Sequence, residues 1–236
     1  MGIFIDSGAS ITSVVPIYYG SVIHHAVKIA NVGGDDVNEI FMNLQTNSVK
    51  KSVFVNKKVL KAIHENCYVS SNFEQELSEN GYVPSNEPNL VVNGFEKKKP
   101  ELEKKSMSEE ISVGVESFVA PEIFFRPQLL QKTNYSKSLD HVVLDAIRHT
   151  PPLLHQHFLQ NIYLVGENTK FPGLKERLTE EIHKKVPQFP VTVHERLDHK
   201  FDAWHGAKQF STTTPNFLDL CVDSQDYQNN EHNKFL

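Results

Sequence analysis

Residues 2–17 constrain this chain more than any other stretch, because they predict two strands joined by a tight polar turn. Residues 3–5 are a short apolar run, and residues 13–17 are rich in β-branched side chains. The turn between them contains Gly8, which adopts backbone conformations that other residues disfavour. Backbone N–H groups and small hydroxyls in such a turn suit a phosphate, and the Asp6 carboxylate suits a hydrated metal ion. A surface hairpin with an aspartate turn is the alternative interpretation of this spacing.

Further motifs follow in order along the chain, among them a glycine-rich turn before a predicted helix and a Pro-Glu pair in an apolar stretch. The blocks are residues 3–8 with 15–20, 31–36, 66–69 with 73–76, 118–127, 161–166 with 171–173, and 200–206. Together they cover nearly the whole chain and resemble the actin family. Residues 3–20 resemble the second of that family's two phosphate-binding hairpins. We therefore expect this chain to be the C-terminal portion of a longer actin-related sequence.

The resemblance implies an α/β fold, with an actin-like, ribonuclease H-like mixed sheet flanked by helices, a small helical lobe and an insertion. The expected segments are residues 1–33 and 111–214 (the two parts of the core), 34–80 (the helical lobe), 81–110 (the charged insertion) and 215–236 (a polar tail). Prolines, mixed charge and few large apolar residues make the insertion typical of a solvated segment, and we expect it to be mobile. A docking segment that orders on a partner is the alternative.

Residue spacing predicts individual elements within these segments. Strands are expected at residues 22–32, 111–119 and 161–165, and helices from Asp35, at 56–66 and at 139–147.

Composition excludes several classes of protein. The net charge of −5 provides no basic field for nucleic acid, so we expect no direct nucleic-acid partner. No apolar run approaches the length of a membrane span, and we expect no membrane partner. The two cysteines, Cys67 and Cys221, are too far apart for a CxxC motif, which argues against a zinc site.

The resemblance also implies a nucleotide site. Its candidate residues in this sequence are Asp6, Ser7, Gly8, Gly34, Asp36, Gly166, Phe171 and Lys200. Asp6 would contact magnesium through water, and magnesium would bind only together with the nucleotide, ATP. Two of the glycines have an ordinary alternative role, since Gly34 and Gly166 could simply terminate a strand or a helix.

Several positions depart from the family's pattern. Residues 9–10 are Ala-Ser where the family has Asp-Gly, and Ser13 replaces a histidine near the attacking water. Residues 63–64 are Ile-His where the family has Lys-Glu, and Glu167 replaces a glycine. The side chain of Glu167 is larger than a glycine and carries the same sign of charge as a nucleotide. The Ser13 hydroxyl cannot exchange a proton with water at neutral pH as a histidine imidazole can. We therefore predict no ATP hydrolysis, while ATP binding stays open.

Residues 81–84, 94–95 and 220–227 resemble one branch of the family, actin-related protein 6. That branch is nuclear. The resemblance of this chain to it implies a non-catalytic structural subunit of a chromatin-remodelling complex that exchanges a variant histone. The expected partners are protein subunits of that complex, with histones among the candidates. The alternative is an ATP-binding actin-like protein of the cytoplasm and cytoskeleton.

Overall fold

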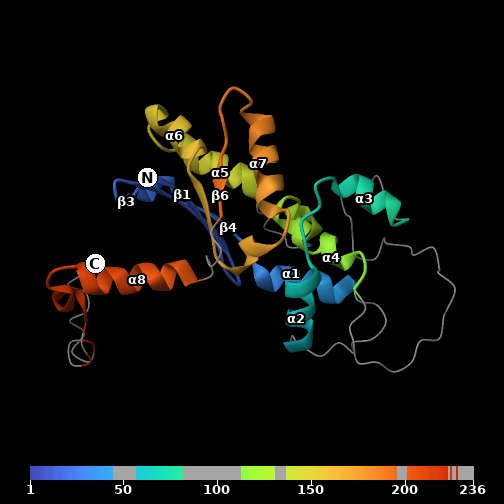
Figure 1. Ribbon diagram of the computed structural model, residues 1–236, viewed down its shortest axis with the longest axis horizontal. Helices are drawn as coiled ribbons and strands as arrows, with labels where there is room; N and C mark the ends of the chain where they lie inside the picture. The colour runs from blue at the N-terminus through green and yellow to red at the C-terminus, as the bar shows by residue number, and fades with distance from the viewer. Residues whose placement is uncertain are drawn as a thin grey trace. The chain divides into compact units, whose positions relative to one another are not determined.

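A computed structural model (Figure 1) describes residues 1–44, 57–81, 113–130, 137–195, 201–222, 224 and 227. Its strands are β1 (Gly2–Ser7), β2 (Thr12–Tyr18), β3 (Ser21–Val22), β4 (Lys28–Ala30), β5 (Ile162–Val165) and β6 (Val193–His194). They form one sheet in the order β3-β2-β1-β5-β6, with β4 also paired with β2. Strand β1 is antiparallel to β2 and parallel to β5, which is parallel to β6. The mixed sheet confirms the predicted α/β class.

The register of the sheet brings the ends of three strands together. Asp6 lies opposite Ser13 in the β1–β2 hairpin, and on its other side it lies opposite Val165 of β5. Because β1 and β5 are parallel, their carboxyl ends meet at the same edge of the sheet. The turn after β1 and the turn after β5 are therefore neighbours.

The helices are α1 (Gly34–Leu44), α2 (Lys57–Asn66), α3 (Phe73–Glu79), α4 (Glu116–Val119), α5 (Leu139–Arg148), α6 (His155–Leu159), α7 (Leu174–Lys185) and α8 (Asp202–Thr213). Short 3-10 helices are η1 (His24–Ala26), η3 (Pro121–Phe124), η4 (Pro127–Leu129), η5 (Pro152–Leu154), η6 (Glu167–Lys170) and η8 (Phe217–Leu220). Helix α5 contacts β2, β4 and α7, and so covers one face of the sheet (Figure 1).

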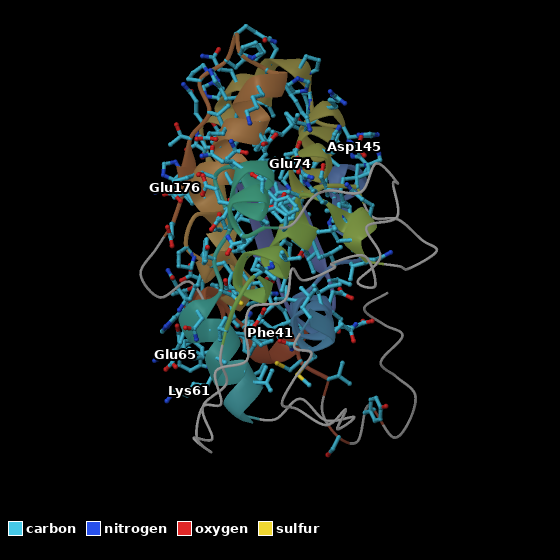
Figure 2. All side chains as sticks on the ribbon, turned by 90° about the vertical axis from the view of Figure 1, so that its right-hand side faces the viewer. Phe41, Lys61, Glu65, Glu74, Asp145 and Glu176 are labelled. Carbon is cyan, nitrogen blue, oxygen red and sulfur yellow. The ribbon has the colours of Figure 1, made fainter. Side chains whose placement is uncertain are left out.

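Helix α1 begins where the sequence predicted, with Asp35 and Asp36 in its first turn, where acidic side chains are favoured by the helix dipole. It contacts both α2 and α4. Phe41, labelled in Figure 2, is fully buried on α1. The outer side of α2 carries Lys61 and Glu65, which lie 3.7 Å apart (Nζ to Oε1) and are both exposed (Figure 2). Helices α1 and α2 fall within residues 34–80, the predicted small lobe, whose bounds stay a prediction.

The strand predicted at residues 22–32 is wrong, because η1 separates β3 from β4. Both short strands pair with the same strand, β2: Val22 with Ile17, and Lys28 with Val14. Pro16 lies between these two pairings and has no N–H to donate to the ladder. The chain leaves the sheet at this point, and the Ile23 N–H donates to the Pro16 carbonyl (2.9 Å).

The strand predicted at residues 111–119 is also wrong in its described part, where residues 116–119 form α4. The Glu116 carboxylate accepts a hydrogen bond from the Gly114 N–H (2.8 Å), and the Ser117 hydroxyl donates to the Gly114 carbonyl (2.7 Å). These bonds stabilise a helical turn. All four residues of α4 are buried, and a short run that is buried on every side has no periodicity to distinguish a helix from a strand.

Residues 200–236 form a compact unit distinct from residues 1–199. Within it, α8 has no buried residue, and Trp204 packs edge-on against the His205 ring at 5.0 Å. The five predicted segment boundaries stay a prediction, and the charged insertion lies outside the described residues except for Gly81. Of the helices that the structure describes, none combines the length and apolar character that a membrane crossing needs.

Candidate functional site

The turn between β1 and β2 is closed by its own hydrogen bonds. The Gly8 N–H donates to the Ile11 carbonyl (3.0 Å), and the Ser7 and Thr12 hydroxyls lie 2.9 Å apart. Thr12 also donates to the carbonyl of Val32 (2.8 Å), so the hydrogen between the two hydroxyls comes from Ser7. Ser7 and Thr12 are buried. The Ser7 hydroxyl, a candidate phosphate ligand, therefore donates into the protein interior.

Asp6 and Gly166 meet at the carboxyl ends of β1 and β5, as their predicted roles require. Gly166 has a φ of +89°, in the region that favours glycine. A Cβ atom at this position would lie 2.4 Å from the Ser7 carbonyl oxygen and 2.8 Å from Asp6 Oδ1. Asp6 itself is exposed. The backbone after β5 thus passes directly against the hairpin, with the Asp6 carboxylate beside it.

The start of α1 contacts the other side of the hairpin tip. The Gly34 N–H donates to the Gly8 carbonyl (3.1 Å), and the Asp35 N–H donates to the Ala9 carbonyl (2.7 Å). A Cβ at Gly33 would lie 2.3 Å from the same Ala9 oxygen, so this approach requires glycine. Two further candidates, Gly34 and Gly8, are therefore brought together through a direct backbone bond.

Asp36 is buried and acts on its own helix. Its Oδ2 accepts a hydrogen bond from the Gly33 N–H (2.8 Å), and the Asp36 and Val37 N–H groups donate to the Gly33 carbonyl (3.1 and 3.3 Å). The first backbone donors of a helix usually lack intrahelical partners. Here the N–H groups from residue 33 to residue 37 all have acceptors.

Asn168 is a central residue of this site that sequence reasoning missed. Its Nδ2 lies 2.6 Å from the Gly8 carbonyl, 3.3 Å from the Ser7 carbonyl and 3.2 Å from the Ser7 hydroxyl. The side chain is 8% exposed. One signal in the sequence could have identified it: Asn168 comes two residues after Gly166, the glycine that ends a predicted buried strand. If that strand is parallel to the first strand of the hairpin, the turn after it lies beside the hairpin.

Of the two remaining candidates, the structure describes only Phe171. Phe171 is buried and its ring lies 6.5 Å from that of Phe124, so it belongs to the hydrophobic core. Lys200 lies outside the described residues. Two of the departures from the family pattern do come together, because His64 Nε2 of α2 lies 3.8 Å from Glu167 Oε1. Both side chains are partly exposed, so this ion pair depends on protonation of His64 and contributes little to stability.

A nucleotide at this edge would meet a mixed set of groups. Within the described residues, the Ala9 and Ser10 N–H groups have no hydrogen-bond acceptor, and both residues are exposed at the tip. The Ser10 hydroxyl donates to Asp35 Oδ2 (3.1 Å). Asp6 lies beside the same turn, so the carboxylates of Asp6 and Asp35 both lie near these N–H groups. Such carboxylates repel a polyphosphate unless a cation lies between them.

Comparison with known proteins agrees with the blocks found in the sequence. The family described as Actin matches residues 1–234. The chain is 27% identical over 261 aligned residues to the protein named Actin-like protein arp6 of Aspergillus fumigatus, an alignment that covers 95% of this chain and 54% of that protein. The chain thus spans about half the length of this relative. The predicted resemblance and the predicted fold class are both confirmed.

Proposed function

This chain belongs to the actin family, and we propose that it serves as a non-catalytic structural subunit of a nuclear chromatin-remodelling assembly that exchanges a variant histone. The observation that carries the proposal is the similarity to an actin-like protein named arp6 along 95% of the chain. Residues 81–84, 94–95 and 220–227 resemble the same branch, which implies the nuclear role. Its partners would be protein subunits of the assembly, with histones among the candidates.

The contacts at the hairpin support a role without catalysis. Ser13 lies directly opposite Asp6 in the hairpin register, at the position where the family has a histidine. A serine hydroxyl does not accept a proton from water at neutral pH, so it cannot act as the general base of a hydrolysis. The Ser7 hydroxyl and the first N–H groups of α1 are already bonded within the protein.

The second candidate function is an ATP-binding actin-like cytoskeletal protein in the cytoplasm. It is favoured by one observation: at a turn that resembles a phosphate hairpin, the N–H groups of the exposed residues Ala9 and Ser10 have no acceptor within the described residues. Magnesium would then be held only together with the nucleotide, with Asp6 contacting it through water.

Affinity purification of the tagged complete protein distinguishes these candidates. From nuclear extract, we expect it to recover a remodelling ATPase and further subunits at constant ratios across a gel-filtration peak. Ile5→Asp places a charge at a fully buried position and serves as the misfolded control, which should recover none of them. Recovery of filament or motor proteins from the cytoplasmic fraction, without remodelling subunits, would contradict the proposal and favour the second candidate.

A further inference from the structure

Three separate segments meet at one seam, which we define as residues 7–10 of the hairpin, 33–36 at the start of α1, and 166–168 after β5. Its backbone and side-chain bonds run from one segment to another: Gly34 to Gly8, Asp35 to Ala9, and Asn168 to both Ser7 and Gly8. The seam joins the lobe that contains α1 to the sheet that contains β1 and β5.

A directed chain of hydrogen bonds runs through the seam. Asn168 Nδ2 donates to the Ser7 hydroxyl, Ser7 donates to the Thr12 hydroxyl, and Thr12 donates to the Val32 carbonyl just before α1. Every hydroxyl in this chain both donates and accepts, and the residues that carry them are buried. Hydrogen bonds in series within a protein interior reinforce one another, whereas a broken member leaves a buried polar group unpaired.

The start of α1 has the form of an anion site, since backbone N–H groups at a helix N-terminus attract phosphates and carboxylates. In this chain the N–H groups of Gly34 and Asp35 are directed at the carbonyls of Gly8 and Ala9 instead. The Asn168 carboxamide also fills the space beside Gly34, where an added Cβ would lie 2.8 Å from Asn168 Oδ1. Protein atoms thus occupy the positions through which a bound anion could link hairpin and helix.

We propose that this seam is a ligand-independent lock, in which Asn168 and the hairpin carbonyls hold the α1 lobe to the sheet whether or not a nucleotide is present. The inference rests on the proposed function as a structural subunit. A surface that other subunits recognise would then keep one shape, because no nucleotide cycle opens the lobe. Asn168 is the positioning residue of the lock, since it contacts the hairpin on one side and Gly34 on the other.

Amide hydrogen exchange of the complete protein tests the lock directly. We expect the Gly34 and Asp35 amides to be protected without nucleotide, and their exchange rates to change less than about twofold when millimolar magnesium-ATP is added. Fast exchange without nucleotide, followed by slowing of about tenfold or more on addition of magnesium-ATP, would overturn the proposal. This comparison uses only the wild-type protein, so it stays decisive even if a variant fails to fold.

Two variants then locate the lock at Asn168. Asn168→Ala should raise the exchange rates of the Gly34 and Asp35 amides by about tenfold or more. Asn43→Ala removes an exposed amide from the same lobe and should leave both rates unchanged. Equal protection in the wild type and in folded Asn168→Ala would contradict the assigned role of Asn168.

The outcome is separable from that of the purification experiment. Nucleotide-dependent protection together with recovery of remodelling subunits would overturn the lock and leave the proposed function standing. Nucleotide-independent protection together with recovery of cytoskeletal proteins would overturn the proposed function alone.

Discussion

The guanidinium of Arg177 lies 3.4 Å (Nη2 to Oε1) from the carboxylate of Glu122, a side chain with no exposed surface. Arg126 Nε lies 3.2 Å from the same Glu122 oxygen. Arg177 also donates to the Ser70 carbonyl (2.7 Å) and to Glu181 Oε1 (2.9 Å). This cluster ties α7 to η3 and to the segment before α3, so it joins parts of the chain that are far apart in sequence.

Glu122 should make stability depend on pH. Burial raises the pKa of Glu122 from 4.5 to about 7, although Arg177 and Arg126 oppose the shift. Because the folded state holds this proton more tightly than the unfolded state, the stabilisation is complete below about pH 4.5 and is lost as pH rises through about 7. A shift of this size corresponds to a change of about 3 kcal/mol in the free energy of unfolding.

Urea unfolding at a series of pH values checks this prediction. Glu122→Gln carries no titratable proton and should flatten the pH dependence between about pH 5 and about pH 7. Glu65→Gln, which removes an exposed carboxylate paired with Lys61 and away from Glu122, should keep the wild-type slope. The same slope in the wild type and in Glu122→Gln would rule out Glu122 as the titrating group.

Arg177→Ala should strongly destabilise the fold. The substitution removes one of the two arginines that contact the buried Glu122 carboxylate. It also removes the guanidinium that lies over the Phe125 ring, 5.2 Å from the ring centroid. We expect a loss of about 1–3 kcal/mol in the free energy of unfolding, measured by urea denaturation at neutral pH, because the buried Ser70 carbonyl loses its donor while Glu122 can take up a proton. The exposed Arg148→Ala is the matched control and should change stability by about 0.5 kcal/mol or less. Similar values for the two variants would show that the cluster contributes little.

Gly166→Ala should destabilise the protein through both backbone strain and collision. The position has a positive φ, and the new methyl group would lie 2.4 Å from the Ser7 carbonyl oxygen. The expected loss is about 2 kcal/mol or more, read from thermal melting. Gly206→Ala is the control, because a Cβ there meets nothing within 4 Å and alanine favours the helix. A Gly166→Ala protein that melts like the wild type would contradict the close packing of β5 on the hairpin.

The sequence predicted the elements whose periodicity is unambiguous, and it failed where contacts between distant residues decide the structure. The hairpin, α1 and β5 were predicted because alternating or helical spacing marks a single buried face. The strand at residues 22–32 was wrong because Pro16, on the neighbouring strand, interrupts the pairing. Propensity within residues 22–32 contains no information about that partner.

The candidate site shows the same limit. Asp6, Ser7, Gly8, Gly34 and Gly166 meet in space because two parallel strands end at one edge, which the family resemblance implied. Asn168 was missed, since its importance depends on the carbonyls that surround it and on its burial. Phe171 was predicted to contact the nucleotide; the structure shows that its side chain is buried beside Phe124, and the nucleotide contact stays a prediction.

The central claim is that this member of the actin family has a structural role and does not hydrolyse ATP. Phosphate release by the purified complete protein with magnesium-ATP tests it most directly. The account predicts that the wild type and Asp6→Ala release phosphate at the same rate as buffer without protein. Asp6 is exposed, so this substitution should leave the fold intact. A wild-type rate clearly above that background, and lost in Asp6→Ala, would contradict it.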